Sequence, residues 1–456
     1  MVEIKAGTHV HFVGIGGVSM SALAELLLQR DCLVSGSDRQ ASPLTDRLKT
    51  LGVTIYIGHA AQNIQSADLL VYTSATDIEN PERVAAAQKE IPQVRRAEFL
   101  GYLTQEHPTI CIAGTHGKTT TTAMVGAVLE AGELDPTILV GGIVQGFENN
   151  LKIGTGKYWV IEADEYDRSF LALTPAIAVV TTLEADHLDC YKDINDIRAT
   201  FEQFVNLLPS NGCAVLCYDE PEVCALNLNN QISRITYGHN NSSQLRFEDI
   251  TPSGSGCTFT LFDNQIKIDT VTLRVPGEHN VRNALAAIGV GRCLNIDWHH
   301  IKTGIESFRG VHRRFDILGT ANNITVVDDY AHHPTEIRAT LQAARQGWPN
   351  GRIIAAFQPH LFTRTRDFAD DFAHELQAAD LVYVTDIYPA REEPIPGIDS
   401  TIITNNIPNA NYTPTLEALK DTLIPNLQPG DLLIVMGAGD IEKVPHQIWN
   451  EIQKNS

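Results

Sequence analysis

Short apolar runs alternate along this chain with longer segments in which apolar residues recur every three to four positions. Short apolar runs are typical of buried strands, and the longer pattern is typical of amphipathic helices. Strands that alternate with helices favour parallel sheets covered by helices. The pattern therefore predicts an α/β protein with mainly parallel sheets.

The alternation divides the 456 residues into three blocks. The first, residues 1–106, opens with a strand, a glycine turn and an amphipathic helix. The second, residues 107–313, contains strongly apolar strands with acidic ends and a β meander from Cys257 to Val275. The third, residues 314–456, alternates strands and helices again. At about 100–200 residues per domain, the length agrees with three domains.

The most informative segment is a Gly-rich turn between an apolar strand, Thr109 to Ala113, and a helix, Ala123 to Glu130. Such a turn aims backbone N–H groups and a helix N-terminus at phosphate. Lys118 adds a positive charge at the outer phosphates, and the Thr119 hydroxyl suits a Mg²⁺ shell. The pattern predicts a nucleoside triphosphate site formed by Gly114, Thr115, His116, Gly117, Lys118, Thr119 and Thr120.

A second glycine turn follows the first strand of the chain, with Gly14, Gly16 and Gly17, and Asp38 ends the next strand. This spacing is similar to a dinucleotide fingerprint, but Ser19 replaces the third glycine. The residues favour binding of a nucleotide or diphosphate. A structural tight turn and a nicotinamide cofactor are the alternatives.

Acidic residues end two apolar strands of the second block, and they are Glu162, Asp164, Glu165, Asp186, His187 and Asp189. Ligands collect at the carboxyl ends of parallel strands, so both groups are expected near the phosphate turn. Mg²⁺ prefers oxygen ligands and takes few of them from protein. The sequence predicts a metal site here, against the alternative of solvated strand ends.

Two further polar groups are candidates for binding. Asparagine side chains that open an Ala-rich helix suit an adenine edge, although helix capping by Asn280 explains them equally well. In the third block, polar and basic residues follow two apolar strands and could hold an amino acid, with an Arg fork for its carboxylate. The first set is His279, Asn280 and Asn283, and the second is Asp328, Asp329, Tyr330, His332, His333, Arg364 and Arg366.

Composition narrows the partners. The formal net charge of −21 disfavours nucleic acid and an anionic membrane surface. The first residues lack the pattern of a secretory signal, and no apolar run approaches the ~20 residues that span a bilayer. We therefore expect a soluble, cytoplasmic protein. The cysteines, including the loose group Cys213, Cys217 and Cys224, are expected to be thiols.

Several motifs in series resemble the Mur ligases over nearly the whole chain. They are GIGGVSMSALAE with SGSD, AGTHGKTTTT, EADE, LEADHLD, GEHNVRNALAA, GVHRRFD, DDYAHHPTEI and FQPHLFTRTRDF, in the order of that family. The resemblance implies a Rossmann-like N-terminal domain for a UDP-sugar, a central P-loop ATPase domain with a mainly parallel sheet, and a C-terminal Rossmann-like α/β domain for an amino acid.

The resemblance also implies an activity: ATP-dependent ligation of L-alanine to the lactyl carboxylate of UDP-N-acetylmuramate through an acyl phosphate, in peptidoglycan precursor synthesis. ATP and Mg²⁺ are the implied cofactors, and a monomer or homodimer is expected. The implied metal ligands are Thr119, Glu162 and His187. The implied catalytic residues are Lys118, Glu162, His187, His332 and Arg364, and the amino-acid ligands are Tyr330, His332 and Arg364.

The implied nucleotide contacts fall into two groups. ATP would also contact His279, Asn280, Asn283, Arg314 and Asp329. The UDP-sugar would contact Gly14, Gly16, Gly17, Ser19, Asp38, His59 and Ser74, so the first domain would bind no nicotinamide cofactor.

The sequence departs from family patterns at two positions. Glu202 stands fifteen residues after His187, so we expect no carbamylated lysine, and Leu361 stands where some relatives carry an arginine. Four rival functions remain, and one of them, a nucleotide-gated binding protein without chemistry, would leave the polar cluster of the third block unexplained. A ligase that attaches a preformed tripeptide to the same UDP-sugar shares most motifs, whereas a folylpolyglutamate synthetase would lack the first block. An oxidoreductase would leave Lys118 unused.

Overall fold

The computed structural model describes residues 3–146, 150–187, 190–253, 255–390 and 392–454. The chain forms two compact units, one comprising residues 1–244 and 286–304 and the other residues 245–285 and 305–456. Helices α8 (Glu278–Cys293) and α9 (Trp298–Ser307) cross the division. Each unit is described by itself.

The first unit begins with a parallel five-stranded sheet in the order β3-β2-β1-β4-β5. Its strands are β1 (His9–Val13), β2 (Leu33–Asp38), β3 (Thr54–Ile57), β4 (Leu69–Tyr72) and β5 (Gln93–Arg95). Its helices are α1 (Val18–Leu28), α2 (Pro43–Thr50), η1 (Ala61–Ile64), α3 (Pro81–Gln88) and α4 (Arg96–Thr104). The strand order reverses between β1 and β4, which is the doubly wound arrangement expected of a nucleotide-binding domain.

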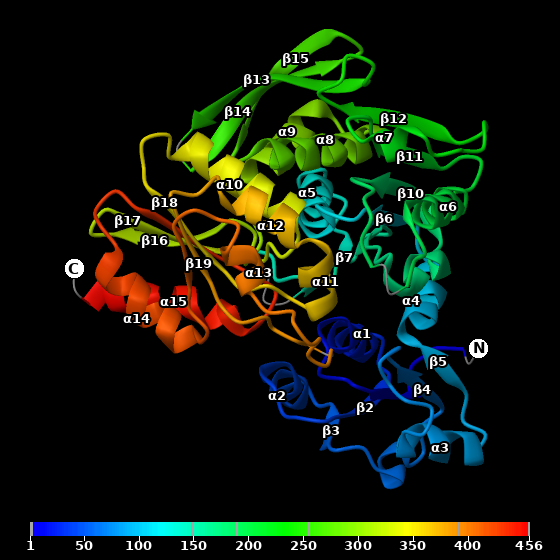
Figure 1. The fold of residues 1–456 in the computed structure, drawn as a ribbon. Helices are drawn as coiled ribbons and strands as arrows, with labels where there is room; N and C mark the ends of the chain where they lie inside the picture. The colour runs from blue at the N-terminus through cyan, green and yellow to red at the C-terminus, as the bar shows by residue number, and fades with distance from the viewer. Residues whose placement is uncertain (1–2, 147–149, 188–189, 254, 391, 455–456) are drawn as a thin grey trace. The chain divides into compact units, whose positions relative to one another are not determined.

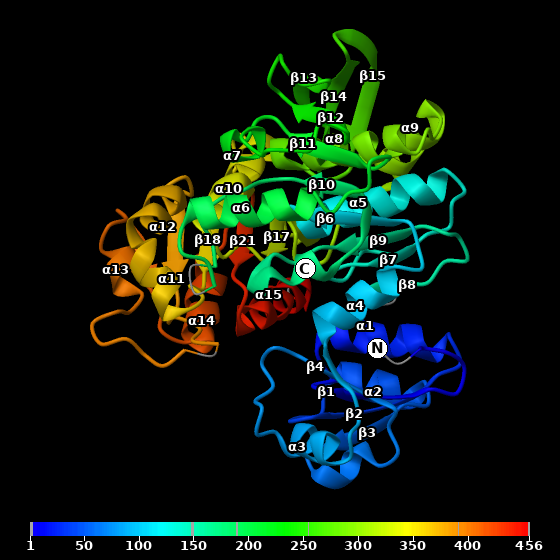
Figure 2. The same cartoon turned by 90° about the vertical axis from the view of Figure 1, so that its right-hand side faces the viewer.

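Helices cover both faces of this sheet, and its central strands are buried on both sides (Figure 2). On one face, Leu23 of α1 and Phe99 of α4 pack with Phe12. On the other, Ala85 and Ala86 of α3 pack with strand residues of β1 and β4. The central strands β1 and β4 are therefore largely buried, whereas β3 at the edge of the sheet is partly exposed along its length.

A second sheet of the first unit has the order β12-β11-β10-β6-β9-β7-β8, parallel except for β8. Its strands are β6 (Thr109–Ala113), β7 (Thr137–Leu139), β8 (Leu151–Lys152), β9 (Trp159–Glu162), β10 (Pro175–Val180), β11 (Cys213–Cys217) and β12 (Ser233–Gly238). Its other elements are α5 (Lys118–Ala131), η2 (Tyr166–Ala172), α6 (Ile194–Val205) and α7 (Pro221–Cys224). The predicted strand over Thr109 to Ala113 is confirmed at the same residues.

The helix after the phosphate turn begins at Lys118, not at Ala123 as the sequence suggests. Threonine is a weak helix former, so the run of four threonines obscures the start. Burial decides instead: Thr121 and Thr122 are fully buried, and the Thr122 hydroxyl donates to the carbonyl of Lys118 at 2.8 Å. The longer helix brings its N-terminus directly to the glycine turn.

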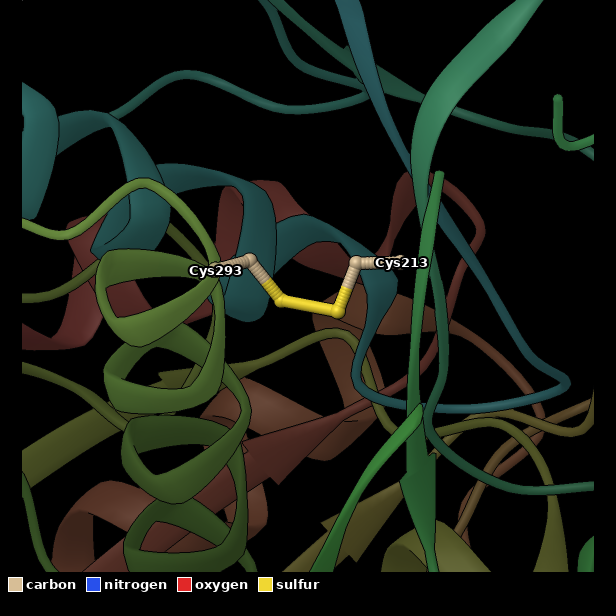
Figure 3. The surroundings of a disulfide bond; sticks show 2 residues. All are labelled: Cys213 and Cys293. Carbon is tan, nitrogen blue, oxygen red and sulfur yellow. A yellow bond between two sulfur atoms is a disulfide. The ribbon is translucent and has the colours of Figure 1, made fainter. Parts of the chain in front are cut away.

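The expectation that the cysteines are thiols is wrong for one pair. Cys213 on β11 and Cys293 at the end of α8 form a disulfide, with 6.5 Å between their Cα atoms (Figure 3). The described cysteines Cys32, Cys111, Cys190, Cys217, Cys224 and Cys257 are free. The two partners are 80 residues apart, so spacing in the sequence could not reveal the bridge.

The second unit contains a six-stranded sheet in the order β16-β17-β21-β18-β19-β20, parallel except for β16. Its strands are β16 (Asp316–Ala321), β17 (Ile324–Asp329), β18 (Ile353–Phe357), β19 (Leu381–Val384), β20 (Ala410–Tyr412) and β21 (Leu432–Met436). Its helical elements are α10 (Pro334–Gly347), α11 (Phe362–Asp367), α12 (Ala369–Leu376), α13 (Thr401–Thr404), α14 (Leu416–Asn426), η3 (Asp440–Glu442) and α15 (Lys443–Lys454).

Alternate residues of these strands face two separate cores. Val327 and Ile434 pack with α10 and α12, whereas Val326 and Val435 pack with α14 and α15. Figure 1 shows these helix pairs on opposite faces of the sheet. The last strand in sequence, β21, lies in the middle of the sheet, which places its end beside that of β17.

The predicted β meander is present but starts earlier. It comprises the antiparallel strands β13 (Leu245–Ser253), β14 (Gly256–Asp263) and β15 (Ile266–Leu273). In the described parts of both units, no helix is long and apolar enough to cross a membrane.

Reduction of the disulfide is expected to lower the free energy of unfolding by about 2–4 kcal/mol, because a long loop is then released in the unfolded chain. Urea unfolding with and without a phosphine reductant measures the difference. The Cys293→Ser variant should match the reduced protein and should not respond to the reductant. Identical unfolding curves for oxidised and reduced protein would contradict the structural role of the bridge.

Candidate functional site

The phosphate turn of the first unit is held open by its glycines. Gly114 (φ 138°) and Gly117 (φ 81°) have positive φ, and Gly117 immediately precedes α5. A Cβ atom on Gly114 would lie 2.0 Å from Oγ1 of Thr181. The Thr181 hydroxyl also donates to the carbonyl of His116 at 2.5 Å, and the His116 N–H donates to Oγ1 of Thr182 at 2.8 Å. Strand β10 therefore fixes the turn through its polar end.

Lys118 is held by the same turn and by an acidic partner. Its ammonium group donates to the carbonyls of Gly114 (2.7 Å) and Thr115 (3.2 Å), and to Oε1 of Glu165 (2.8 Å). Glu165 is almost fully buried, and its Oε1 lies 3.5 Å from Nε2 of His187. Glu165 thus contacts both Lys118 at the phosphate turn and His187 in the segment that follows β10.

The charges of Lys118 and Glu165 stabilise each other because the two groups lie close together. Burial would lower the pKa of Lys118, but the carboxylates, first of all Glu165, outweigh it and raise the pKa. Burial would likewise raise the pKa of Glu165, but Lys118 and His187 hold it below its usual value. Lys118 and Glu165 are both ionised at neutral pH, so a cation is positioned before any phosphate arrives.

Thr119 and Glu162 form the candidate metal pair. The Thr119 hydroxyl donates to Oε1 of Glu162 at 3.1 Å, and the N–H of Gly141 donates to Oε2 at 2.6 Å. A hydroxyl beside a fixed carboxylate is the oxygen set that Mg²⁺ takes from protein when phosphate and water complete its shell. The donors therefore fit Mg²⁺. The predicted ligand His187 lies 3.5 Å from Glu165. The predicted acidic residue Asp189 lies outside the described residues.

The other predicted site residues of the first unit meet at the carboxyl edge of the five-stranded sheet. Gly14, with φ 84°, starts the turn after β1, and the N–H of Gly16 donates to Oδ2 of Asp38 at 2.8 Å. The N–H of Gly58 donates to the carbonyl of Asp38 at 2.7 Å, which brings His59 beside this turn. Gly17 and Ser19 are exposed at the start of α1. Asp38 thus organises the turn.

A cavity of about 150 Å³ extends this edge, and Ser74 is one of its lining residues. The others include Arg95, Arg96, Asp167 and Arg168. Asp167 and Arg168 both adopt positive φ, which costs free energy in residues that carry a Cβ. The three arginines are ion-paired, Arg95 with Asp167 (3.7 Å), Arg96 with Asp164 (4.0 Å) and Arg168 with Asp196 (2.9 Å), so the lining carries charges of both signs.

In the second unit, the predicted amino-acid ligands cluster after β17 and β18. Nδ1 of His332 lies 2.9 Å from the carbonyl of Tyr330 and 3.1 Å from Oε2 of Glu336. Both neighbours accept hydrogen bonds, so Nδ1 carries the proton and Nε2 of a neutral ring is an acceptor. The guanidinium groups of Arg313 and Arg314 lie over the Tyr330 ring at 4.9 and 5.0 Å. Arg364 lies on α11.

Four predicted ATP contacts have structural partners within the second unit. The carboxylate of Asp329 accepts the N–H groups of Ala331 (2.7 Å) and Phe315 (2.8 Å). The side-chain amide of Asn280 donates to the carbonyl of Pro276 at 2.7 Å from inside α8, so it does not act as an N-cap acceptor. Asn283 donates to Oδ1 of Asn280 at 3.3 Å. His279 is partly exposed at the same helix start, and Arg314 pairs with Glu336.

The sequence predicts Glu165 only as one of several acidic residues near the phosphate turn, and the family resemblance gives it no role of its own. Glu165 belongs to an acidic group with Glu162 and Asp164, and the residue types alone do not separate the three. The signal is tertiary: only Glu165 of the three is nearly fully buried. Glu202 accepts the N–H of Asn227 at 3.1 Å. The side-chain amide of Gln358 donates to Oδ1 of Asp440, at the start of η3, at 2.9 Å.

The two carboxylates at the end of β17, Asp328 and Asp329, have different hydrogen-bond partners. Asp329 has several donors, whereas Oδ2 of Asp328 is buried without a hydrogen-bond partner among the described residues, and Oδ1 lies 3.7 Å from Nε of Arg313. Burial, only partly offset by Arg313, raises the pKa of Asp328 to about 7. Asp328 therefore changes charge near neutral pH.

A doubly wound first sheet, a glycine turn with a held lysine and a hydroxyl–carboxylate pair define an α/β protein that binds nucleotide phosphates. Three family models match the chain: the Mur ligase family catalytic domain at residues 9–108, the Mur ligase middle domain at 112–291, and the Mur ligase glutamate ligase domain at 313–439. The chain belongs to the Mur ligase family.

Similar proteins cover almost the full length. A UDP-N-acetylmuramate–L-alanine ligase of Salinibacter ruber is 46% identical over 95% of this chain and 92% of its own. One from Clostridium tetani is 45% identical over 95% and 96%. Among solved structures, the UDP-N-acetylmuramate-alanine ligase of Thermotoga maritima has a TM-score of 0.83 at 31% identity, covering 98% of this chain and 100% of its own. A murein peptide ligase of Psychrobacter arcticus gives 0.69 at 28% identity, covering 98% and 99%.

Lys118→Ala is expected to reduce turnover by about a thousandfold or more, because a preorganised charge at the transferred phosphate is lost. It should also lower stability by about 3 kcal/mol, since Glu165 is left as a buried, uncompensated charge. Phosphate release and thermal unfolding measure the two effects. The Lys118→Ala/Glu165→Gln double variant should recover stability but not turnover. Retained turnover in either variant would remove the phosphate turn from the mechanism.

Asp328→Asn is expected to stabilise the second unit at pH 8 but not at pH 4. The pKa of Asp328 is about 7 in the folded protein against an ordinary value of 3.8, so its favourable contribution is complete below pH 3.8 and lost as pH rises through 7. The gain at pH 8 should be about 1–3 kcal/mol. Chemical denaturation at both pH values measures it. An equal effect at the two pH values would contradict the assigned pKa.

Proposed function

We propose that this chain ligates L-alanine to the lactyl carboxylate of UDP-N-acetylmuramate, using ATP, as the first amino-acid addition in peptidoglycan precursor synthesis. The observation that carries the proposal is the phosphate turn of Gly114 to Thr119, with Lys118 held and Thr119 paired to Glu162. The full-length similarity to enzymes of that name supports the choice of substrates.

We further propose three functional domains, with residues 1–106 for the UDP-sugar, 107–313 for ATP and 314–456 for the amino acid. The limits of the three family models support this division. The protein acts in the cytoplasm as a monomer or homodimer, with no nucleic-acid or membrane partner. The net charge of −21 supports the last point.

In the first chemical step, a carboxylate oxygen of the lactyl group attacks the γ-phosphorus of ATP, and the bond to the bridging oxygen of ADP breaks. Lys118 and the N–H groups at the start of α5 stabilise charge on the transferred phosphoryl group. Thr119 and Glu162, with His187, would hold Mg²⁺, which neutralises charge on the phosphates. The same phosphates would be lined by the other residues of the turn, which are Gly114, Thr115, His116, Gly117 and Thr120. The product is an acyl phosphate.

In the second step, the amine of L-alanine attacks the acyl carbon, and phosphate leaves. The amine must first lose a proton, and Nε2 of His332 can accept it because Nδ1 already donates to acceptors. Arg364 would pair with the alanine carboxylate, and Tyr330 would line the same pocket. His279, Asn280, Asn283, Arg314 and Asp329 are proposed on the adenine side of ATP, the last of them as a structural support for the strand end.

The rival function is ligation of a preformed tripeptide to the same UDP-sugar, which the likeness to murein peptide ligases keeps open. That likeness is weaker in both TM-score and identity than the likeness to the alanine-adding enzyme. The two functions share the first step and differ only in the acceptor. The acceptor assay therefore decides between them.

Purified protein with ATP, Mg²⁺ and UDP-N-acetylmuramate is expected to release phosphate when L-alanine is added, and much more slowly with glycine or L-serine. No acceleration is expected with the tripeptide. Mass spectrometry of the nucleotide product should show the added alanine. Acceleration by the tripeptide alone would establish the rival function, and no release with any acceptor would overturn the ligase proposal. Lys118→Ala is the matched inactive control.

A further inference from the structure

A buried carboxylate lies beneath the nucleotide edge of the first sheet and takes no part in the chemistry described above. Glu82 lies in the first turn of α3 and has no exposed surface. Its neighbours come from four other places, the end of β2, the interior of β1, the loop after β3 and the short helix η1. Among the described residues it pairs with no lysine or arginine, which requires an explanation because an isolated charge in the interior is costly.

One oxygen of Glu82 organises the loop after β3. Oε1 accepts a hydrogen bond from the side-chain amide of Asn63 at 2.6 Å and one from the backbone N–H of Ala60 at 3.3 Å. Asn63 also donates to the carbonyl of Gly58 at 3.1 Å. Both neighbours of His59 in the chain are thus tied to the same carboxylate.

The other oxygen acts on the His59 ring through a serine. Oε2 accepts the hydroxyl of Ser37 at 2.5 Å, and Oγ of Ser37 lies 2.9 Å from Nδ1 of His59. Since Ser37 donates its only proton to Glu82, it can only accept from His59. Oε2 itself lies 3.4 Å from the same Nδ1. Nδ1 therefore carries hydrogen, and Nε2 of the neutral ring is an acceptor.

The carboxylate is ionised and has donors on both oxygens. Burial would raise the pKa of Glu82, but the nearby His11 ring and the hydrogen bonds from Ser37 and Asn63 outweigh it and lower the pKa. Nε2 of the fully buried His11 lies 3.7 Å from Oε2. The start of α3 adds a favourable helix dipole. The network keeps the Glu82 carboxylate ionised and holds the His59 ring in one orientation.

His59 stands where a base would be recognised. It follows β3 at the carboxyl edge, next to the end of β2, and 18% of its side chain is exposed while Nδ1 faces inward. Nucleotides bind at this edge of a doubly wound sheet. An outward acceptor matches the N3–H donor of uracil and opposes the N3 lone pair of cytosine.

We propose that Glu82 is a positioning residue for the nucleotide substrate, which acts through Ser37 to hold His59 with Nε2 as acceptor and so selects uracil over cytosine. This inference rests on the proposed use of a UDP-linked substrate. It names Glu82 as the residue that sets the base preference. It also names the direction of the hydrogen bond responsible, from the base to Nε2 of His59.

The Glu82→Gln variant tests the direction of this bond. Ala60 and Asn63 still donate, so the amide oxygen must take the place of Oε1, and the amide NH₂ then faces Ser37. Ser37 becomes an acceptor from residue 82 and donates to Nδ1 of His59, which moves the ring proton to Nε2. Uracil loses its partner and cytosine gains one.

Binding of UDP and CDP, measured by calorimetry, is expected to favour UDP in the unaltered protein by about tenfold or more, and the ratio should fall about tenfold or invert in Glu82→Gln. The KM for the UDP-sugar should rise, while kcat and the KM for ATP stay unchanged. Ser37→Ala should also reduce the ratio. Glu79→Gln, an exposed carboxylate of the loop before α3, is the matched control and should leave the ratio unaltered.

An unaltered ratio in a folded Glu82→Gln protein would overturn the proposal. If that variant does not fold, the ¹⁵N shifts of His59 in the unaltered protein decide, because the proposal requires the Nδ1–H form and the Nε2–H form would overturn it. Failure of the proposed function looks different. A protein that binds neither UDP nor UDP-N-acetylmuramate and releases no phosphate would remove the substrate itself, and this inference with it.

Discussion

The contact between the Lys118 ammonium and the Glu165 carboxylate, 2.8 Å long and largely buried, is the interaction on which the catalytic edge depends. It keeps a lysine charged inside the protein and aims it at the carbonyl oxygens of its own turn. Without Glu165 the lysine would be desolvated with little compensation, and without Lys118 the carboxylate would be. A triphosphate that enters this turn meets a cation already fixed in place, so little reorganisation opposes binding.

The same device recurs at the other strand ends. Glu82, Asp38 and Asp329 are carboxylates that accept backbone or hydroxyl donors from a neighbouring loop and so tie that loop to a strand end. None of them needs a lysine or arginine to be useful, because several hydrogen bonds distribute the charge. Asp328 differs from them because one of its oxygens has no hydrogen-bond partner in the described part of the chain, and burial raises its pKa to about 7. Carboxylates thus hold the loops at several strand ends.

Sequence reasoning found the residues of the phosphate turn because glycine, lysine and threonine each have a distinct physical task there. It also found the strand before the turn, whose limits the structure confirms. It misplaced the start of α5, since threonine propensity is weak and the burial of Thr121 and Thr122 was not visible. The residue types alone did not separate Glu162, Asp164 and Glu165; the family resemblance singled out Glu162, and only burial singled out Glu165. It missed the Cys213–Cys293 bridge because no local spacing announces a pair 80 residues apart.

The sequence by itself determined the class of fold, the three α/β blocks and the family, because periodic apolar runs and ordered motifs are local properties that survive without coordinates. The tertiary structure alone decided which acid pairs with Lys118, which cysteines join, and which ring nitrogen of His59 carries a proton. Each of these depends on distances between residues far apart in the chain. The type of a residue determines which chemistry it can perform. Its burial and its hydrogen-bond partners determine which charge or protonation state it adopts.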